Sequence, residues 1–197
     1  MRVAFAPGTW RYVAPLVVGG LFALPLSLVL GAALLAAALA TLAFHRDPDR
    51  QPPAEGVLAP ADGRVSVVRR EGDRLRVGVF MNVTDVHVNR APLSGTVESV
   101  THSPGAHRPA FSKDSDRNEK VHVDFGDFVV VLIAGAFARR IHPYVAAGAN
   151  VDRGERIGHI SFGSRVDVVM PADVGRADLR VERGDAVVAG ETVLAER

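Results

Sequence analysis

The stretch that decides the fold is Gly148-Ala149-Asn150-Val151-Asp152-Arg153-Gly154-Glu155-Arg156-Ile157. It recurs nearer the C-terminus as Gly184-Asp185-Ala186-Val187-Val188-Ala189-Gly190-Glu191-Thr192-Val193, and both copies follow the pattern G-x-x-V-x-x-G-E-x-(I/V). Glycine supplies the left-handed backbone that tight turns need, so spaced glycines around a valine are typical of turns between short strands. The repeat therefore predicts a compact β fold.

The same turn chemistry is found in barrel-sandwich domains, which include lipoyl carriers and related hybrid barrels. A lipoyl or biotinyl carrier needs a lysine at the tip of a hairpin, and neither copy of the repeat contains a lysine. The repeat therefore predicts a barrel-sandwich or hybrid-barrel-like β domain without the function of a carrier.

Short runs of β-branched residues continue this pattern upstream. From Val57 onward they are separated by Gly, Pro and Asp, and they include residues 63–68, 75–80, 121–125 and 128–133. Runs of this length and spacing predict strands, so we expect residues 51–197 to form a mostly β domain.

The N-terminal part of the chain is apolar. Residues 12–44 carry no charged side chain, and as one helix they would measure about 50 Å, well beyond the hydrocarbon core of about 30 Å. Pro15, Gly19-Gly20 and Pro25 interrupt the first half of this run. We therefore predict a membrane-spanning helix over residues 25–44, preceded by a shorter apolar helix with which it could form a hairpin.

Residues 1–50 are thus expected to be an N-terminal apolar helical membrane segment and its linker. The apolar run is too long for a signal peptide. Arginines flank it at Arg2, Arg11, Arg46 and Arg50, which under the positive-inside rule favours both ends on the cytoplasmic side. We expect the protein at the cell (inner) membrane, with its β domain in the cytoplasm.

The composition excludes several kinds of chemistry. The formal net charge is +1, which gives no electrostatic case for binding nucleic acid. The absence of cysteine excludes disulfides, thiolate nucleophiles and Cys-ligated metals. The only lysines are Lys113 and Lys120, and this scarcity argues against pyridoxal phosphate, which needs a lysine. His102 and His107 match no recognised ligand pattern, so we expect no metal.

One dipeptide, Gly163-Ser164 within Phe162-Gly163-Ser164-Arg165-Val166-Asp167, offers chemistry that side chains alone lack. The Ser164 hydroxyl can attack the carbonyl of Gly163, which has no Cβ to shield it, and convert the peptide bond to an ester. Removal of the serine α-proton then expels the Gly163 carboxylate, and the resulting dehydroalanine hydrolyses to a pyruvoyl group. The alternative is an ordinary Gly-Ser turn.

Five segments in order decide between these two interpretations. They are Ala59-Pro60-Ala61-Asp62-Gly63, residues 80–92, Asp116-Arg117-Asn118-Glu119, residues 133–135 with 138–141, and residues 162–167. From about Phe44 to Pro171, the chain closely resembles the short, bacterial and archaeal type of phosphatidylserine decarboxylase. The resemblance implies a self-cleaving, pyruvoyl-dependent enzyme of phospholipid biosynthesis that converts phosphatidylserine to phosphatidylethanolamine and CO2.

The resemblance also implies site residues. Asp62 would orient His87, and His87 would act as general base toward Ser164, the residue that becomes the pyruvoyl group. Longer relatives carry two histidines three residues apart in this block, whereas the second position here is Arg90. Self-processing and catalytic proton transfer therefore both fall on His87, unless His142 or another histidine supplies the second function.

Four arginines are candidates for the lipid phosphate or carboxylate, because a guanidinium binds such groups with two parallel hydrogen bonds. They are Arg117, Arg139, Arg140 and Arg165. Arginines close to a membrane also attract anionic headgroups without forming a specific site.

The expected partners are phosphatidylserine in the membrane and the protein's own cleavage products. Cleavage would give a heterodimer of chains 1–163 and 164–197, alone or in a larger oligomer. Two alternatives remain: a pyruvoyl decarboxylase of a soluble amino acid, and a non-enzymatic, membrane-anchored barrel-sandwich adaptor whose chain stays uncut.

Overall fold

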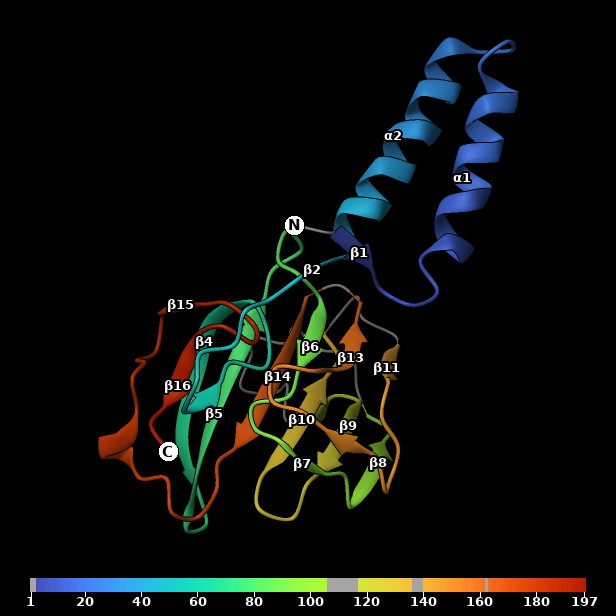
Figure 1. Cartoon of the computed structure of the whole chain (residues 1–197). Coiled ribbons are helices and arrows are strands. Elements are labelled where there is room, and N and C mark those ends of the chain that lie inside the picture. The colour runs from blue at the N-terminus through green and yellow to red at the C-terminus, as the bar shows by residue number, and fades with distance from the viewer. Residues whose placement is uncertain (1–2, 106–116, 136–139, 162) are drawn as a thin grey trace. The chain divides into compact units, whose positions relative to one another are not determined.

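The computed structural model of the chain describes residues 3–105, 117–135, 140–161 and 163–197. The chain forms two compact units, Met1–Asp49 and Arg50–Arg197. The first unit contains two helices and the second consists mainly of strands (Figure 1).

The first unit is a helical hairpin with a small strand pair at its base. It contains β1 (Val3–Phe5), α1 (Trp10–Ala23), α2 (Leu28–Phe44) and β2 (Arg46–Pro48), and β1 pairs antiparallel with β2. Ser27 caps α2, since its hydroxyl accepts the Leu30 N–H at 3.4 Å. The two helices can pack closely because Gly20 has no Cβ. A Cβ there would lie only 2.9 Å from the Leu35 side chain.

The prediction of an N-terminal membrane-spanning segment is wrong. The chain turns between α1 and α2, so the apolar run is divided between two helices, and the second begins at Leu28. At a rise of about 1.5 Å per residue, α2 measures about 26 Å, less than the hydrocarbon core of about 30 Å. Within the described part of the chain, no helix is both long enough and apolar enough to cross a bilayer.

The prediction of a mostly β domain is confirmed in the second unit. Its strands are β3 (Val57–Leu58), β4 (Gly63–Glu71), β5 (Arg74–Met81), β6 (Val88–Arg90), β7 (Gly95–Thr96), β8 (Ser99–Ser103), β9 (Lys120–Asp124), β10 (Val129–Ile133), β11 (Ile141–Pro143), β12 (Asn150–Val151), β13 (Arg156–Ile160), β14 (Ser164–Val169), β15 (Ala186–Val187) and β16 (Val193–Ala195). They form a seven-stranded antiparallel sheet in the order β15-β4-β5-β14-β10-β9-β8 and a three-stranded sheet in the order β11-β13-β6 (Figure 1). Two further pairs are β12-β7 and β16-β3.

The large sheet has one apolar face and one charged face in its centre. Successive side chains of a strand point to opposite faces, so the residues of β14 alternate between the two. Val166 and Val168 belong to the hydrophobic core, whereas Arg165 and Asp167 lie on the other face. Ser164 precedes Val166 by two residues and therefore shares the face of the core.

The repeat builds two equivalent turns. Val151 of the first copy pairs with Gly95, and Val187 of the second copy pairs with Gly63. The partner segments 59–63 and 91–95 both have the sequence A-P-x-x-G. Each copy thus packs against its own A-P-x-x-G segment, which gives the domain an internal pseudosymmetry.

Candidate functional site

Ser164 is the first residue of β14 and its side chain is fully buried. Among the described residues, its hydroxyl oxygen Oγ has no hydrogen-bond partner. Buried hydroxyls are almost always hydrogen-bonded, so an unpaired one in a core requires an explanation. A reacting group that awaits its partner is such an explanation.

Gly163 adopts a left-handed conformation, with φ of +58°, in the turn between β13 and β14. Apart from its own chain neighbours, no described residue has a heavy atom within 4 Å of the position that a Cβ on Gly163 would occupy. The backbone before Ser164 is therefore sterically open, as an attack on the Gly163 carbonyl requires.

Residues from three of the segments that resemble the decarboxylases, namely Ser164, Asn89 and Gly63, lie next to Met81. Met81 is the antiparallel partner of Ser164 across β5 and β14, which places the two Cα atoms about 4.5–5.5 Å apart. Asn89 of β6 donates a hydrogen bond from Nδ2 to Met81 Sδ at 3.5 Å. Gly63 also packs here, because a Cβ on Gly63 would lie 3.2 Å from Met81 Cα.

His87 lies beside this cluster and is almost completely buried. It directly precedes β6. Its carbonyl oxygen accepts the Ile160 N–H at 3.3 Å, and the chain reaches Ser164 only a few residues after Ile160. The backbone of His87 is thus bonded to the end of the strand that precedes the turn before Ser164.

The tautomer of His87 follows from its ring contact. Nδ1 lies 2.8 Å from the Asp85 carbonyl oxygen. A carbonyl oxygen can only accept, so Nδ1 carries the proton and a neutral ring has its basic lone pair on Nε2. This is the tautomer that a general base needs.

Asp62 is held by a different set of contacts. Its carboxylate accepts hydrogen bonds from Arg50 at 2.8 and 3.0 Å and from the Ala189 N–H at 2.8 Å. The His87 ring is oriented by the Asp85 carbonyl instead. The predicted role of Asp62 in orienting His87 therefore stays a prediction, and the observed contacts are structural.

Arg165 lies in a buried network of charges on the other face of the sheet. Its Nε donates to Asp167 Oδ1 at 2.7 Å, and Arg76 donates to Asp167 Oδ2 at 3.0 Å. The side chain of Asp167 is fully buried and that of Arg165 is nearly so. The Arg165 guanidinium is thus committed to Asp167, and its predicted contact with lipid phosphate has no support from this geometry.

The other predicted arginines lie near or beyond the edges of the described segments. Arg117 and Arg140 are exposed to solvent, and Arg139 falls outside the described residues. Exposed guanidinium groups are available to an anionic ligand, but the structure does not join these two to the cluster around Met81.

Arg90 and His142 take part in other contacts. Arg90 is buried, and its guanidinium donates to the Gly154 carbonyl at 2.9 Å, in the turn before β13. His142 stacks on His159 with ring centroids 4.5 Å apart. These two histidines align with Val88 across the small sheet, so His142 lies on the face opposite to Asn89.

Two residues of this region carry no signal in the sequence that reveals their contacts. Arg50 is recognisable there only as a positive charge flanking the apolar run, although it binds Asp62 through both carboxylate oxygens. Asn89 belongs to the block that resembles the decarboxylases, yet nothing in the sequence around it indicates that it is buried against Met81. Only the packing reveals either contact.

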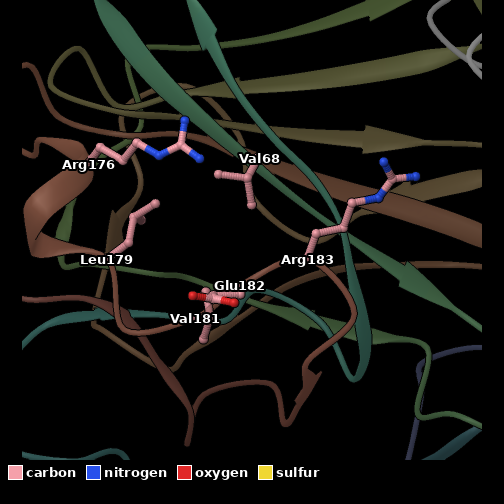
Figure 2. Close-up of a pocket in the computed structure, with 6 residues that line it drawn as sticks. All are labelled: Val68, Arg176, Leu179, Val181, Glu182 and Arg183. Carbon is pink, nitrogen blue, oxygen red and sulfur yellow. The ribbon is translucent and has the colours of Figure 1, made fainter.

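A separate cavity of about 490 Å³ is lined by Val68, Arg176, Leu179, Val181, Glu182 and Arg183. Arg176 extends its guanidinium toward Val68, whereas Arg183 points away from the other lining side chains (Figure 2). Val68 of β4 pairs with Val77 of β5, which pairs with Val168 of β14. Val168 lies four residues, or about 13 Å, along β14 from Ser164. The cavity therefore lies outside the Ser164 cluster.

Comparison with known proteins identifies the family. The family model described as phosphatidylserine decarboxylase matches residues 37–195. A protein of Halobacterium salinarum, provisionally named archaetidylserine decarboxylase proenzyme, is 58% identical over 98% of this chain and 99% of its own length. The phosphatidylserine decarboxylase proenzyme of Streptomyces avermitilis is 46% identical over 97% of this chain and 93% of its own.

The match to the family model covers the segments that carry Asp62, His87 and Ser164, and the relatives are similar over almost their whole length. The chain therefore belongs to the phosphatidylserine decarboxylase family.

Proposed function

We propose that this protein is made as a precursor, cleaves itself between Gly163 and Ser164, and decarboxylates phosphatidylserine to phosphatidylethanolamine with a pyruvoyl group derived from Ser164. The observation that carries the proposal is the buried Ser164 Oγ, which has no partner among the described residues and follows an open, left-handed Gly163. The names of the relatives, which are proenzymes, support cleavage of the chain.

Self-cleavage consists of an acyl shift and an elimination. The Ser164 hydroxyl adds to the Gly163 carbonyl carbon, the C–N bond breaks, and the hydroxyl proton ends on the new amine, which leaves an ester. A base then removes the Ser164 α-proton, and the C–O bond to the Gly163 carboxylate breaks. The dehydroalanine so formed takes up water and releases ammonia, which gives a pyruvoyl group at the head of chain 164–197.

His87 is the residue we assign to these proton transfers. Its basic nitrogen is Nε2, because Nδ1 donates to the Asp85 carbonyl. A neutral imidazole can accept a proton at this nitrogen, so His87 can take the hydroxyl proton and later the α-proton. In the processed enzyme, the same residue would return a proton to the substrate carbon after CO2 has left.

The surroundings of Ser164 fit a pyruvoyl group. The site is buried and lies against the apolar Met81, so water is largely excluded. A pyruvoyl ketone supplies a carbonyl that takes up the substrate amine and accepts electrons as CO2 leaves. A poorly hydrated site favours loss of CO2, because the carboxylate charge disperses in the transition state.

The two cleavage products would remain together as a heterodimer. Chain 164–197 begins with β14, which lies between β5 and β10 in the middle of the large sheet. Its later strands β15 and β16 pair with β4 and β3 of the other chain. Cleavage at residue 163 cuts a turn and leaves these strand pairs intact.

Mass spectrometry of the intact protein tests the proposal. Wild-type material should give two chains, with the smaller one bearing a ketone at its head in place of the amine of a chain that begins with serine. Ser164→Ala should remain a single chain without decarboxylase activity. If Ser164→Ala is cut at the same bond, or if active wild-type protein is uncut, the proposed function is wrong.

The lipid tail is a second question that the comparisons raise. Phosphatidylserine and archaetidylserine carry the same phosphoserine headgroup on different hydrocarbon-bearing glycerols, and relatives of this chain are named for each. CO2 release should therefore be measured with both lipids in matched vesicles and with free serine. Activity on free serine alone would favour the soluble amino acid decarboxylase instead.

The substrate lies in a bilayer, so this function requires the enzyme to contact a membrane surface during turnover. The localisation of the protein at the cell membrane stays a prediction. Cell fractionation followed by immunodetection of both cleavage products would test it.

A further inference from the structure

Asn89 is, like Ser164, a fully buried polar residue. Its hydrogen bonding within the described residues is incomplete. Its Nδ2 donates to Met81 Sδ at 3.5 Å, and a thioether sulfur is a weak acceptor. Its amide oxygen Oδ1 has no partner in the described part of the chain. A stability role alone does not account for a buried carboxamide satisfied this poorly.

The position of Asn89 relates it to the cleavage site. Met81, to which it is bonded, is the cross-strand partner of Ser164. Asn89 also pairs with Gly158 of β13, the strand that leads into the turn before Ser164. Asn89 and Ser164 are therefore both neighbours of Met81. Among the described residues, neither the Asn89 amide oxygen, which can only accept, nor the Ser164 hydroxyl, which can donate, has a hydrogen-bond partner.

We propose that Asn89 positions Ser164 for self-cleavage, an inference that rests on the proposed function. Its Nδ2 is anchored on Met81, and its Oδ1 accepts the Ser164 hydroxyl in the cleavage-competent state, which holds Oγ toward the Gly163 carbonyl carbon. Hydrogen bonds of this kind are often long in a resting site and tighten as the reaction proceeds. A hydroxyl has one proton, so the hydroxyl turns from Asn89 Oδ1 to the base as Oγ adds to that carbon, and the base takes the proton.

This role and a purely structural one predict opposite effects for Asn89→Leu. Leucine has a similar size and removes the buried amide together with its unpaired oxygen. Replacing an unsatisfied polar group by an apolar group of the same shape is neutral or stabilising for the fold. If Asn89 positions Ser164, cleavage should slow while the folded protein keeps its stability.

The rate of cleavage is measured by following the intact mass of freshly made precursor. Asn89→Leu should cleave at least about tenfold more slowly than wild type, a loss typical for a misplaced reacting group. Thermal stability is compared in the Ser164→Ala background, where no chain is cut. There, Asn89→Leu should have a Tm equal to or above that of the parent.

Asn118→Leu is the matched control. Asn118 is also a buried asparagine, but its Nδ2 donates to the Ala134 carbonyl at 2.7 Å. Its substitution should lower the Tm, and any loss of cleavage should follow that loss of stability. If Asn89→Leu behaves in the same way, with Tm and cleavage falling together, Asn89 is structural and the proposal is overturned.

Hydroxylamine identifies the step that is affected. It cleaves esters and leaves peptide bonds intact under mild conditions, so it cuts any precursor that has completed the acyl shift. Asn89→Leu precursor should resist hydroxylamine, because Asn89 acts before the ester forms. If hydroxylamine cuts this precursor as fast as it cuts wild-type precursor, the ester forms without help from Asn89, and the proposal is wrong.

These outcomes separate the inference from the function on which it rests. Cleavage of Ser164→Ala would overturn the proposed function itself. An uncut Ser164→Ala combined with wild-type cleavage of Asn89→Leu would overturn only the role of Asn89.

Discussion

Asp62 and Ser94 occupy equivalent positions in the two A-P-x-x-G segments and accept equivalent hydrogen bonds. Asp62 Oδ1 accepts the N–H of Ala189 at 2.8 Å, and Ser94 Oγ accepts the N–H of Arg153 at 2.9 Å. Ala189 and Arg153 are themselves the same position of the repeat, directly before its second glycine. One of the roles of Asp62 is therefore to cap a turn, which Ser94 does in the other half of the domain.

Asp62→Ser separates this capping role from any role of the carboxylate. A serine hydroxyl can still accept the Ala189 N–H, as Ser94 does for Arg153, but it leaves Arg50 without the Asp62 carboxylate. We expect a loss of about 1–3 kcal/mol in the free energy of unfolding, since a mostly buried charge-assisted hydrogen bond is lost. If Asp62 also orients His87, self-cleavage should be lost as well.

Ser94→Ala is the control for this prediction. It removes the equivalent cap with no carboxylate involved and should cost about 1 kcal/mol without selectively slowing cleavage. Urea unfolding in the Ser164→Ala background and intact-mass kinetics of the cleavable forms give the two readouts. Normal cleavage by folded Asp62→Ser would leave Asp62 with a structural role alone.

Gly163→Ala should slow self-cleavage at a modest cost in stability. The left-handed backbone at φ of +58° costs an L-residue about 1–2 kcal/mol. The new Cβ would meet no described atom within 4 Å, so the strain is confined to the turn. The methyl group also shields the carbonyl that Ser164 attacks.

Gly72→Ala provides the comparison for Gly163. Gly72 has φ of +63° and equally open surroundings, but it lies in the β4–β5 turn. Both variants should lose similar stability in the Ser164→Ala background. Of the two variants, only Gly163→Ala should accumulate uncut precursor, which a denaturing gel would show. Equal processing of Gly163→Ala and Gly72→Ala would argue against attack on the Gly163 carbonyl.

Asp167→Asn should destabilise the domain strongly. It leaves Arg165 and Arg76 buried without the carboxylate that both of them contact, a change that costs about 3–5 kcal/mol in comparable buried pairs. Asp173→Asn, which removes an exposed ion pair with Arg197, should cost at most about 1 kcal/mol. Chemical unfolding of both variants in the Ser164→Ala background measures these losses of stability. Similar losses for the two variants would contradict the prediction.

His122 should make the fold less stable in mild acid. Burial lowers the pKa of His122 below its ordinary value of 6.5, and repulsion from Lys120 and Arg76 adds to the shift. Between the lowered pKa and 6.5, the unfolded chain binds a proton that the folded chain does not, so stability rises with pH. The stabilisation is complete above a pH of 6.5 and is lost as the pH falls toward the pKa of the folded state.

His122→Gln should therefore flatten the pH dependence of the Tm between neutral pH and pH about 5. His102→Gln is the control, because His102 lies at the surface with a side chain that is 56% exposed. If the two variants show the same pH profile as the wild type, His122 does not carry this dependence.

The sequence by itself determined the class of the domain, the position of its turns and the bond at which cleavage is proposed. Glycine patterns and β-branched runs act locally, and the Gly163-Ser164 chemistry is a property of adjacent residues. The apolar N-terminal run wrongly predicts a spanning helix, since hydropathy records composition and does not locate the turn between α1 and α2.

Only the tertiary structure decided which side chains surround Ser164. Strand register pairs Met81 with Ser164, packing joins Asn89 to Met81, and the His87 carbonyl accepts the Ile160 N–H. No local pattern encodes contacts between segments so far apart in the chain. The same is true of the ion pairs that Asp62 forms with Arg50 and that Arg165 forms with Asp167. Charged side chains cannot stay buried without partners, so packing assigned these groups to ion pairs.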